Sequence, residues 1–292
     1  MATATYAATM EQRGSRRNSA GLARDIEVLE VLGRPEAVEA GGLGVVRIAS
    51  LTGRDKAVVS RTLATLADAG LIDRDAQTLT YRLGSRLYAL AARTAEGTLA
   101  RQARVHLKHV AEVTRETAHL CVLRGGNVLT LMSELSPNQF KTTGWEGVTT
   151  AAWCTPSGRV LLSDWDPESL ALWYAEHGRD EPVLEPREHV GSTHSGFAVL
   201  PRPSTADSPI RDLDTLRAEL AKIRDRGYST SDEELERGVV AASAPVHDFT
   251  ARVVAALNVS APKERIGPQL DKLGRIVSAA ARDLSAALGH TG

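Results

Sequence analysis

Apolar residues in the first third of the chain recur at the three- to four-residue spacing of helices. The spacing predicts helices over residues 22–32, 45–51 and 55–69. Gly33 with Pro35 should end the first helix, Gly53 the second and Gly70 the third, while Asp55 suits the N-cap of the third. Two alternating runs, residues 71–74 and 79–83, then predict a hairpin. The resulting order is helix, helix, turn, helix, hairpin.

The rest of the chain mixes helical and alternating patterns. Helical spacing continues from residue 85 to about 117, with a soft break near Gly97, and then predicts helices over residues 157–176, 211–226 and 268–288. Two hairpins are predicted, at residues 119–124 with 128–135 around Gly125 and Gly126, and at residues 240–247 with 253–260. Strands and helices in this arrangement indicate an α+β domain.

These patterns divide the 292 residues into four parts. Residues 1–20 lack apolar periodicity and predict a disordered arm, residues 21–84 form the helix-rich domain, 85–100 a linker helix and 101–292 the α+β domain. No apolar run approaches the ~20 residues that a membrane helix needs, and no signal-peptide core is present, so we expect a cytoplasmic protein with no membrane partner. The two cysteines, Cys121 and Cys154, predict neither a disulfide framework nor a metal site.

The charge is balanced overall, with 35 basic and 36 acidic side chains, and by itself argues against a polyanionic partner. It is unevenly distributed, however. Residues 1–93 carry 13 basic and 10 acidic side chains, and residues 94–292 carry 22 and 26. A small basic domain joined to a larger acidic one is compatible with DNA binding by the first alone.

The third predicted helix carries the candidate DNA chemistry. After the turn at Gly53 its apolar positions fall on one side, and Lys56, Ser60 and Arg61 on the other, as a helix inserted in the major groove requires. Each cation alone could equally solvate an amphipathic helix, but the turn, the spacing and the hairpin together favour DNA binding. The predicted DNA-contacting residues are Arg54, Lys56, Ala57, Ser60, Arg61, Thr62 and Arg74.

Two motifs resemble one protein family. The run from Ile48 to Gly84, which ends in Ala69-Gly70-Leu71-Ile72-Asp73-Arg74 and Tyr81-Arg82-Leu83-Gly84, resembles the winged helix-turn-helix of the isocitrate lyase regulator (IclR) family of bacterial transcription factors. Its C-terminal signature is similar to Gly227-Tyr228-Ser229-Thr230-Ser231-Asp232-Glu233-Glu234, followed by Gly238-Val239 and Ala244-Pro245-Val246. The resemblance covers about residues 20–289.

The resemblance implies a winged helix-turn-helix domain, a linker helix and a GAF-like effector domain that binds a small metabolite, commonly a carboxylate or an aromatic acid. It also implies homodimers or homotetramers on palindromic operators, and no cofactor. We expect a regulator that is not an enzyme, with repression favoured and activation left open. The implied effector residues are Trp153, Cys154, Ser157, Gly158, Ser231, Val239, Ala241, Asn258 and Ser260, and the strand positions His119 and Cys121 join them.

Some of these residues have two interpretations. Trp153 stands where many members of the family have a smaller polar ring, so it either stacks on an aromatic ligand or fills the core. Ser157 and Gly158 begin a predicted helix, so their backbone N–H groups could bind a carboxylate. Ser231 and Glu234 have the spacing of a capping box, which favours a structural role for Glu234 over acid–base catalysis.

Two alternative functions remain. A small-molecule hydrolase is suggested by the acidic residues and by the loop with Ser192, His194 and Ser195, but residues so close in sequence rarely form a catalytic triad. An oligomeric sensor that acts only through protein partners would leave the polar helix face and the hairpin without a purpose. A DNA-binding regulator explains more of the sequence than either.

Overall fold

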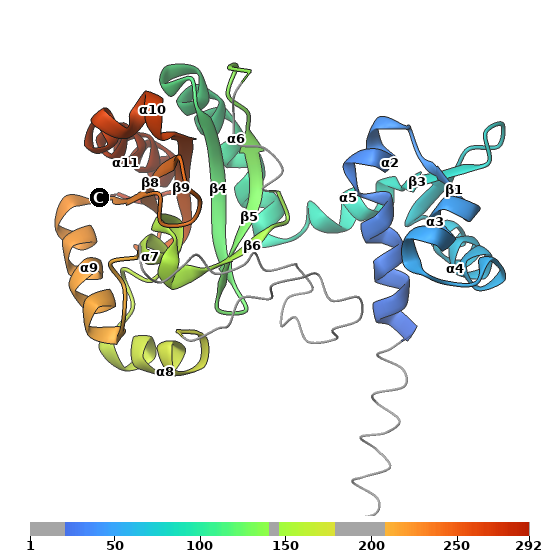
Figure 1. The fold of residues 1–292 in the computed structure, drawn as a ribbon, viewed down its shortest axis with the longest axis horizontal. Helices are drawn as coiled ribbons and strands as arrows, with labels where there is room; N and C mark the ends of the chain where they lie inside the picture. The colour runs from blue at the N-terminus through green and yellow to red at the C-terminus, as the bar shows by residue number, and fades with distance from the viewer. Residues whose placement is uncertain (1–20, 140–145, 179–207, 292) are drawn as a thin grey trace, which may run out of the picture. The chain divides into compact units, whose positions relative to one another are not determined.

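The computed structural model describes residues 21–139, 146–178 and 208–291. The arm predicted for residues 1–20 and the Ser192, His194 and Ser195 loop lie outside these ranges. The chain forms two compact units, Met1–Gly97 and Thr98–Gly292. Figure 1 labels the helices and strands of each unit.

The first unit has the helix and strand order expected from the sequence, with two additions. Its elements are a helix over residues 21–32, α2 (Pro35–Glu39), β1 (Leu43–Gly44), α3 (Val45–Thr52), α4 (Lys56–Asp68), β2 (Ile72–Arg74), β3 (Thr80–Leu83) and α5 (Ser85–Ala91). The three strands form a sheet in the order β1-β3-β2. The predicted helices and hairpin are confirmed, whereas α2 and β1 were not predicted. Pro35 begins α2 because its fixed φ suits a first helical turn.

The ends of α3 and α4 create the turn between them. Gly53 has a φ of 62°, the left-handed conformation that terminates α3. Asp55 then caps α4, and its carboxylate accepts from the N–H groups of Ala57 at 2.8 Å and Val58 at 3.4 Å. Behind the turn, Ile48 and Leu63 are fully buried, so the helix pair is held by one small core.

The stretch after β3 is two helices where one softly broken helix was predicted. α5 ends at Ala91 and α6 (Ala95–Thr114) begins after a break of three residues. Thr94 accepts a hydrogen bond from the N–H of Gly97 at 2.9 Å, as a residue that precedes a helix does. A Cβ on Gly97 would lie 2.1 Å from the Ala91 carbonyl oxygen, so Gly97 permits a close approach rather than making the break.

The second unit is a six-stranded antiparallel sheet in the order β6-β5-β4-β9-β8-β7. Its strands are β4 (Thr117–Arg124), β5 (Asn127–Glu134), β6 (Thr149–Ala151), β7 (Ser229–Asp232), β8 (Val239–His247) and β9 (Val253–Pro262). Gly125 and Gly126 both have positive φ and form the tight turn between β4 and β5. Both predicted hairpins are therefore confirmed.

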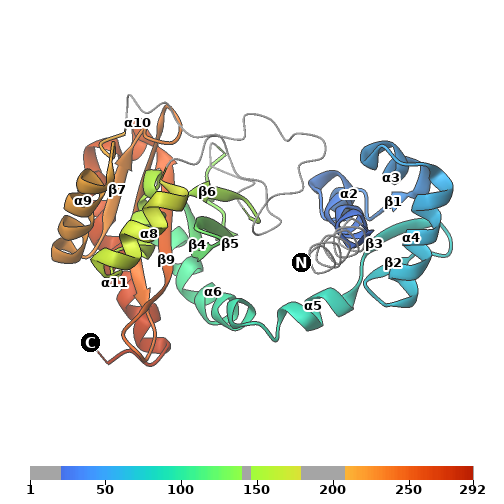
Figure 2. The same ribbon diagram turned by 90° about the horizontal axis from the view of Figure 1, so that it is seen from below.

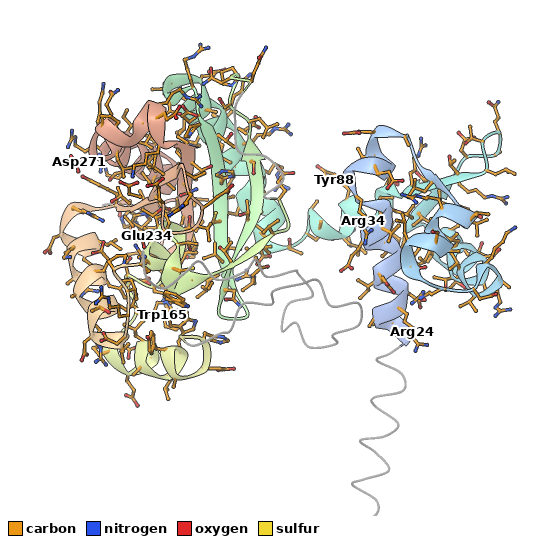
Figure 3. All side chains as sticks on the ribbon, in the orientation of Figure 1. Arg24, Arg34, Tyr88, Trp165, Glu234 and Asp271 are labelled. Atoms are coloured by element: carbon orange, nitrogen blue, oxygen red, sulfur yellow. The ribbon has the colours of Figure 1, made fainter. Side chains whose placement is uncertain are left out.

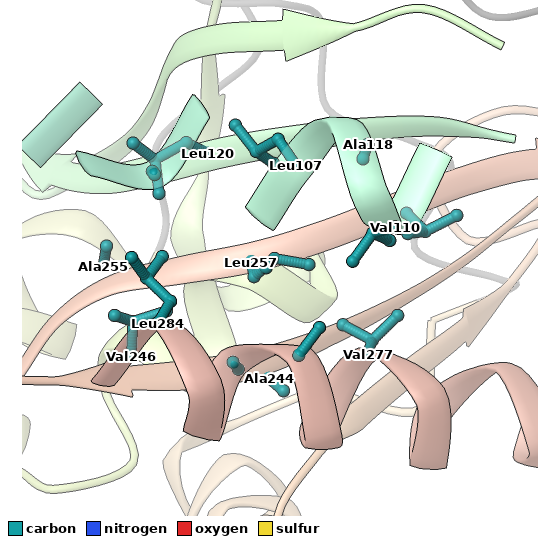
Figure 4. Packing of buried hydrophobic residues seen from close by; sticks show 14 of the residues in the cluster. Leu107, Val110, Ala118, Leu120, Ala244, Val246, Ala255, Leu257, Val277 and Leu284 are labelled. Carbon is teal, nitrogen blue, oxygen red and sulfur yellow. The ribbon is translucent and has the colours of Figure 1, made fainter. Parts of the chain in front are cut away.

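Helices cover both faces of this sheet (Figures 1 and 2). On one face, α6 and α11 (Leu270–Ala287) pack on alternate residues of β4, β8 and β9, as Figure 4 shows for Leu107, Leu257 and Val277. On the other face lie the short helix η1 (Ala152–Cys154), α7 (Pro156–Leu161), α8 (Pro167–His177) and α9 (Leu213–Arg226). α10 (Lys263–Ile266) and η2 (Gly267–Gln269) join β9 to α11. The α+β class is confirmed.

Three features of the second unit differ from the sequence-based expectation. The helix predicted over residues 157–176 is two helices, because Pro167 begins α8 behind an Asp166 cap. β6 and β7 were not predicted, since Thr149–Ala151 is short and Ser229–Asp232 is polar and neither shows an apolar alternation.

In the parts of the chain that the structure describes, no helix is long and apolar enough to cross a membrane.

A substitution at Gly158 tests the packing of α7 against η1. An added Cβ would lie 2.0 Å from the Ala152 carbonyl oxygen, so Gly158→Ala must push α7 away from η1. We expect this variant to lose about 1–3 kcal/mol of unfolding free energy, the usual cost of overpacking. Urea unfolding measures the loss. Gly267→Ala is the matched control, because a Cβ there meets only the flexible Lys263 side chain, and an equal loss in both variants would contradict the argument.

Candidate functional site

Helix α4 presents a polar, cationic face to solvent. Lys56, Ala57, Ser60 and Arg61 are all exposed, while Val59 on the opposite side is fully buried. We call these four exposed residues the recognition face. Among the described residues no ion pair engages Lys56 or Arg61. Small side chains at Ala57 and Ser60 allow close approach to a groove in which the two cations can reach base edges or phosphates.

Two residues predicted to contact DNA lie behind this face instead. The guanidinium of Arg54 is 3.4 Å from the Glu27 carboxylate, and its side chain is only 13% exposed. The hydroxyl of Thr62 lies 3.2 Å from a carboxylate oxygen of Asp25. These two contacts connect α4 and its preceding turn to the first helix.

The hairpin β2–β3 carries cations on its stem and none at its tip. Arg74 lies over the ring of Tyr81, 5.7 Å from the ring centroid, in cation–π geometry. At the tip, Asp75 accepts from the backbone N–H groups of Gln77 and Thr78 at 2.8 Å each, which lowers the pKa of its carboxyl. The tip therefore carries the Asp75 carboxylate and no cation, while Arg74 and Arg82 are the cations of the adjoining strands.

The second unit contains a pocket between the sheet and the start of α7, which we call the sheet pocket. The empty space between its lining atoms, open solvent at the mouth included, is about 570 Å³. Side chains from all six strands, from the start of α7 and from the segment after β7 line it. The lining residues are His119, Cys121, Val128, Thr130, Thr150, Thr155, Pro156, Ser157, Ser231, Leu235, Val239, Ala241, Asn258 and Ser260.

Eight of the predicted effector residues meet in this pocket: His119, Cys121, Ser157, Ser231, Val239, Ala241, Asn258 and Ser260. Strand register brings them together, because β4 pairs with β9 so that His119 lies opposite Asn258. The lining residues Val128, Thr130, Thr150, Thr155, Pro156 and Leu235 were not predicted. The alternation of β5 could have indicated Val128 and Thr130, but β6 and Leu235 reach the pocket only through the tertiary fold.

Trp153, Cys154 and Gly158 do not line the sheet pocket. Trp153 is 1% exposed and packs in the core between the sheet and helices α7 to α9. The thiol of Cys154 donates to the Ala151 carbonyl at 3.3 Å. Gly158 donates its N–H to the hydroxyl of Thr155 at 3.2 Å, which caps α7. Of the two interpretations of Trp153, the geometry favours the core filler.

Burial keeps the two titratable side chains of the pocket uncharged. The ring nitrogens of His119 lie 2.9 Å from the Ser133 hydroxyl and 2.8 Å from the Ser260 hydroxyl. Desolvation lowers the pKa of His119 to about 4. It also raises the pKa of the Cys121 thiol to about 11. Both groups are neutral at pH 7.

A buried ion pair stands behind one wall of the pocket. The guanidinium of Arg159 in α7 donates to both carboxylate oxygens of Glu234, one of them at 3.1 Å, and its Nε donates to the Trp153 carbonyl at 3.1 Å. Arg159 is 1% exposed and Glu234 is 6% exposed. Figure 3 labels Glu234 among the side chains of the second unit. The predicted capping box is wrong, because Ser231 lies in strand β7 and Glu234 has this distant partner.

Comparison with known proteins agrees with both units. Residues 21–76 match the IclR helix-turn-helix domain, and residues 200–286 match the C-terminal domain described as bacterial transcriptional regulator IclR. A probable HTH-type transcriptional regulator, ArcR, from Halobacterium salinarum is 31% identical over 72% of this chain and 73% of its own length. The chain belongs to the IclR family. It is a DNA-binding transcriptional regulator.

Other IclR relatives extend the similarity over nearly the full length. The HTH-type transcriptional regulator KdgR of Escherichia coli is 25% identical over 90% of this chain and 92% of its own. Among solved structures, an IclR homolog from Microbacterium hydrocarbonoxydans complexed with 4-hydroxybenzoate has a TM-score of 0.68 at 22% identity, over 91% of this chain and 98% of that one. The Thermotoga maritima IclR structure has a TM-score of 0.66 at 20% identity, over 93% and 100% of the two chains. These structures share the fold.

Trp153 can be tested as a core residue. Trp153→Ala should lower the free energy of unfolding by about 3–5 kcal/mol, since it empties a fully enclosed site. Leu172→Ala, at a side chain that is 69% exposed, should change it by less than about 0.5 kcal/mol. Chemical denaturation followed by circular dichroism measures both. A Trp153 variant as stable as the Leu172 variant would show that Trp153 is not part of the core.

Because burial lowers the pKa of His119, we expect the free energy of unfolding to depend on pH. Its folded-state pKa of about 4 lies below the ordinary histidine value of 6.5, so protonation favours the unfolded chain. Its contribution is complete above pH 6.5 and is lost as the pH falls towards 4. Between pH 7 and pH 5 the wild type should lose about 2 kcal/mol more unfolding free energy than His119→Gln. Urea unfolding at the two pH values measures this difference, and parallel losses would exclude His119 as the cause.

Proposed function

We propose that this regulator is a ligand-responsive repressor that binds a palindromic operator as a homodimer or homotetramer. In this proposal the recognition face of Lys56, Ala57, Ser60 and Arg61 enters the major groove, and a small organic effector occupies the sheet pocket. The exposed recognition face behind the Asp55 cap is the observation on which the DNA-reading part rests.

The residues of the first unit support distinct roles. Arg61 and Lys56 are exposed on the helix that follows the turn, so they are our base- or phosphate-contacting groups. Arg74, next to the tip of the hairpin, is the proposed phosphate contact. Arg54 and Thr62 hold α4 through their contacts with Glu27 and Asp25, so we propose that they orient the recognition face.

The sheet pocket is the effector site that the second unit supports best. Its walls combine apolar surface with a few polar groups, such as Ser231, Asn258 and Ser260, which is the composition of small-molecule sites. The Microbacterium hydrocarbonoxydans homolog was solved in complex with 4-hydroxybenzoate, which supports a small aromatic ligand for this pocket. The organic acid predicted from the sequence would have to bind here without a cationic side chain from the described lining residues.

Ligand binding must alter DNA affinity through the segment that joins the two units. We propose that α5 and α6 transmit the change, by altering the spacing of two recognition faces in a dimer. A catalytic role is not part of the proposal, because the named relatives are transcriptional regulators. His119, the pocket's one imidazole among the described residues, is held between two serine hydroxyls and is neutral.

Substitution of Arg61 tests the DNA-reading part. With an operator selected from random duplexes by the full-length protein, Arg61→Ala should weaken binding by about 1–3 kcal/mol, roughly 5- to 150-fold. Fluorescence anisotropy at fixed salt measures the dissociation constants. The control is Arg217→Ala, which removes an exposed arginine of α9 that pairs only with Asp214 among the described residues. Unchanged operator affinity in Arg61→Ala would remove this residue from the recognition face.

A further inference from the structure

We infer that the sheet pocket takes an uncharged ligand, such as a phenol, an alcohol or a primary amide, and that it discriminates against a carboxylate anion. This inference rests on the proposed function, in which the sheet pocket is the effector site. It replaces the organic acid that the sequence predicted with an uncharged molecule of similar size.

The first observation is the absence of formal charge on the wall. None of the fourteen described lining side chains is an Asp, Glu, Lys or Arg, and the polar ones are hydroxyls, one thiol, one amide and one imidazole. An anion transferred from water into such a site loses its hydration and finds no opposite charge in return. A neutral ligand loses far less, because hydroxyl and amide groups can replace its hydrogen bonds to water.

The backbone does not supply the missing positive charge. From the sequence, the backbone N–H groups at the start of α7 are expected to bind the carboxylate of an organic acid. In the structure Pro156 has no N–H, and the N–H of Gly158 already donates to the Thr155 hydroxyl. Only the Ser157 N–H remains of the first three positions. The helix is also six residues long, so its dipole is small.

The buried cation behind the pocket is already neutralised. Arg159 lies two residues beyond Ser157, but its guanidinium makes two hydrogen bonds to Glu234 and one to the Trp153 carbonyl. Glu234 in turn directly precedes the lining residue Leu235. A carboxylate in the pocket would have to compete with a buried carboxylate for Arg159, and would leave Glu234 without its partner.

The pocket suppresses charge of both signs on its own side chains. Burial shifts the pKa of His119 downward, which disfavours a cation, and the pKa of Cys121 upward, which disfavours an anion. The same desolvation acts on the charge of any ligand that fills the space between them.

The thiol of Cys121 provides a probe that does not depend on the identity of the effector. Iodoacetamide and iodoacetate are nearly equal in size and differ in charge, and each alkylates a thiolate with loss of iodide. We expect the rate ratio of iodoacetamide to iodoacetate at Cys121 in the native full-length chain to exceed the ratio in the urea-unfolded chain by at least about tenfold. Mass spectrometry of the peptide with Cys121 measures both rates.

Charge at the pocket wall should control this ratio. Ser231→Lys, on edge strand β7, places a cation at the wall and should reduce the selectivity at Cys121 by about tenfold. Ser231→Met is the uncharged control of similar length and should retain it. Native circular dichroism identifies variants that fold, and Thr150→Lys with Thr150→Met on edge strand β6 serves as the second pair.

Three outcomes would overturn the inference: equal ratios in the native and unfolded chains, faster native reaction with iodoacetate, or protection of Cys121 from both reagents. The last outcome counts because a pocket that binds a neutral ligand must admit iodoacetamide. Operator binding of the same preparation separates this result from the proposed function. A chain that binds its operator through Arg61 but lacks charge selectivity at Cys121 loses only the inference about the ligand.

Discussion

The buried ion pair between Arg159 and Glu234 connects the parts of the second unit that form the sheet pocket. The two residues are 75 positions apart, one in α7 and the other in the segment between β7 and β8. Either charge alone would be costly in a buried site, so each stabilises the other, and the Trp153 carbonyl accepts a further hydrogen bond from the Arg159 Nε. Arg159 lies two residues after Ser157 and Glu234 directly before Leu235, and both Ser157 and Leu235 line the pocket.

The ion pair also separates charge from the ligand site. The positive and negative groups satisfy each other behind the wall, so the pocket itself is lined by hydroxyl, amide, imidazole and apolar groups. Gly158 makes the arrangement possible, because only a residue without a Cβ lets α7 lie against Ala152. The core tryptophan, the helix cap and the ion pair are therefore neighbours in one packed region of the second unit.

In the first unit, short sequence signals determine where most helices and strands begin and end. Gly53 ends α3, Asp55 caps α4, and the apolar spacing turns Lys56 and Arg61 to solvent. Each of these signals acts within one or two helical turns, and for that reason the helix-turn-helix and the hairpin could be predicted from sequence. The contacts of Arg54 with Glu27 and of Thr62 with Asp25 could not be predicted, because a helical spacing does not reveal which residues of another helix lie within reach.

The sequence by itself determined the α+β class, the two hairpins of the sheet and the family, because periodicity, turn glycines and short motifs are local properties. Only the tertiary structure decided that β6 and β7 exist, that Trp153 fills the core, and that Glu234 pairs with Arg159. These features depend on strand order and on contacts between residues far apart in the chain. The charge of the sheet pocket also depends on the tertiary structure. The fold decides which side chains line the wall, and it pairs Arg159 with Glu234 outside the lining.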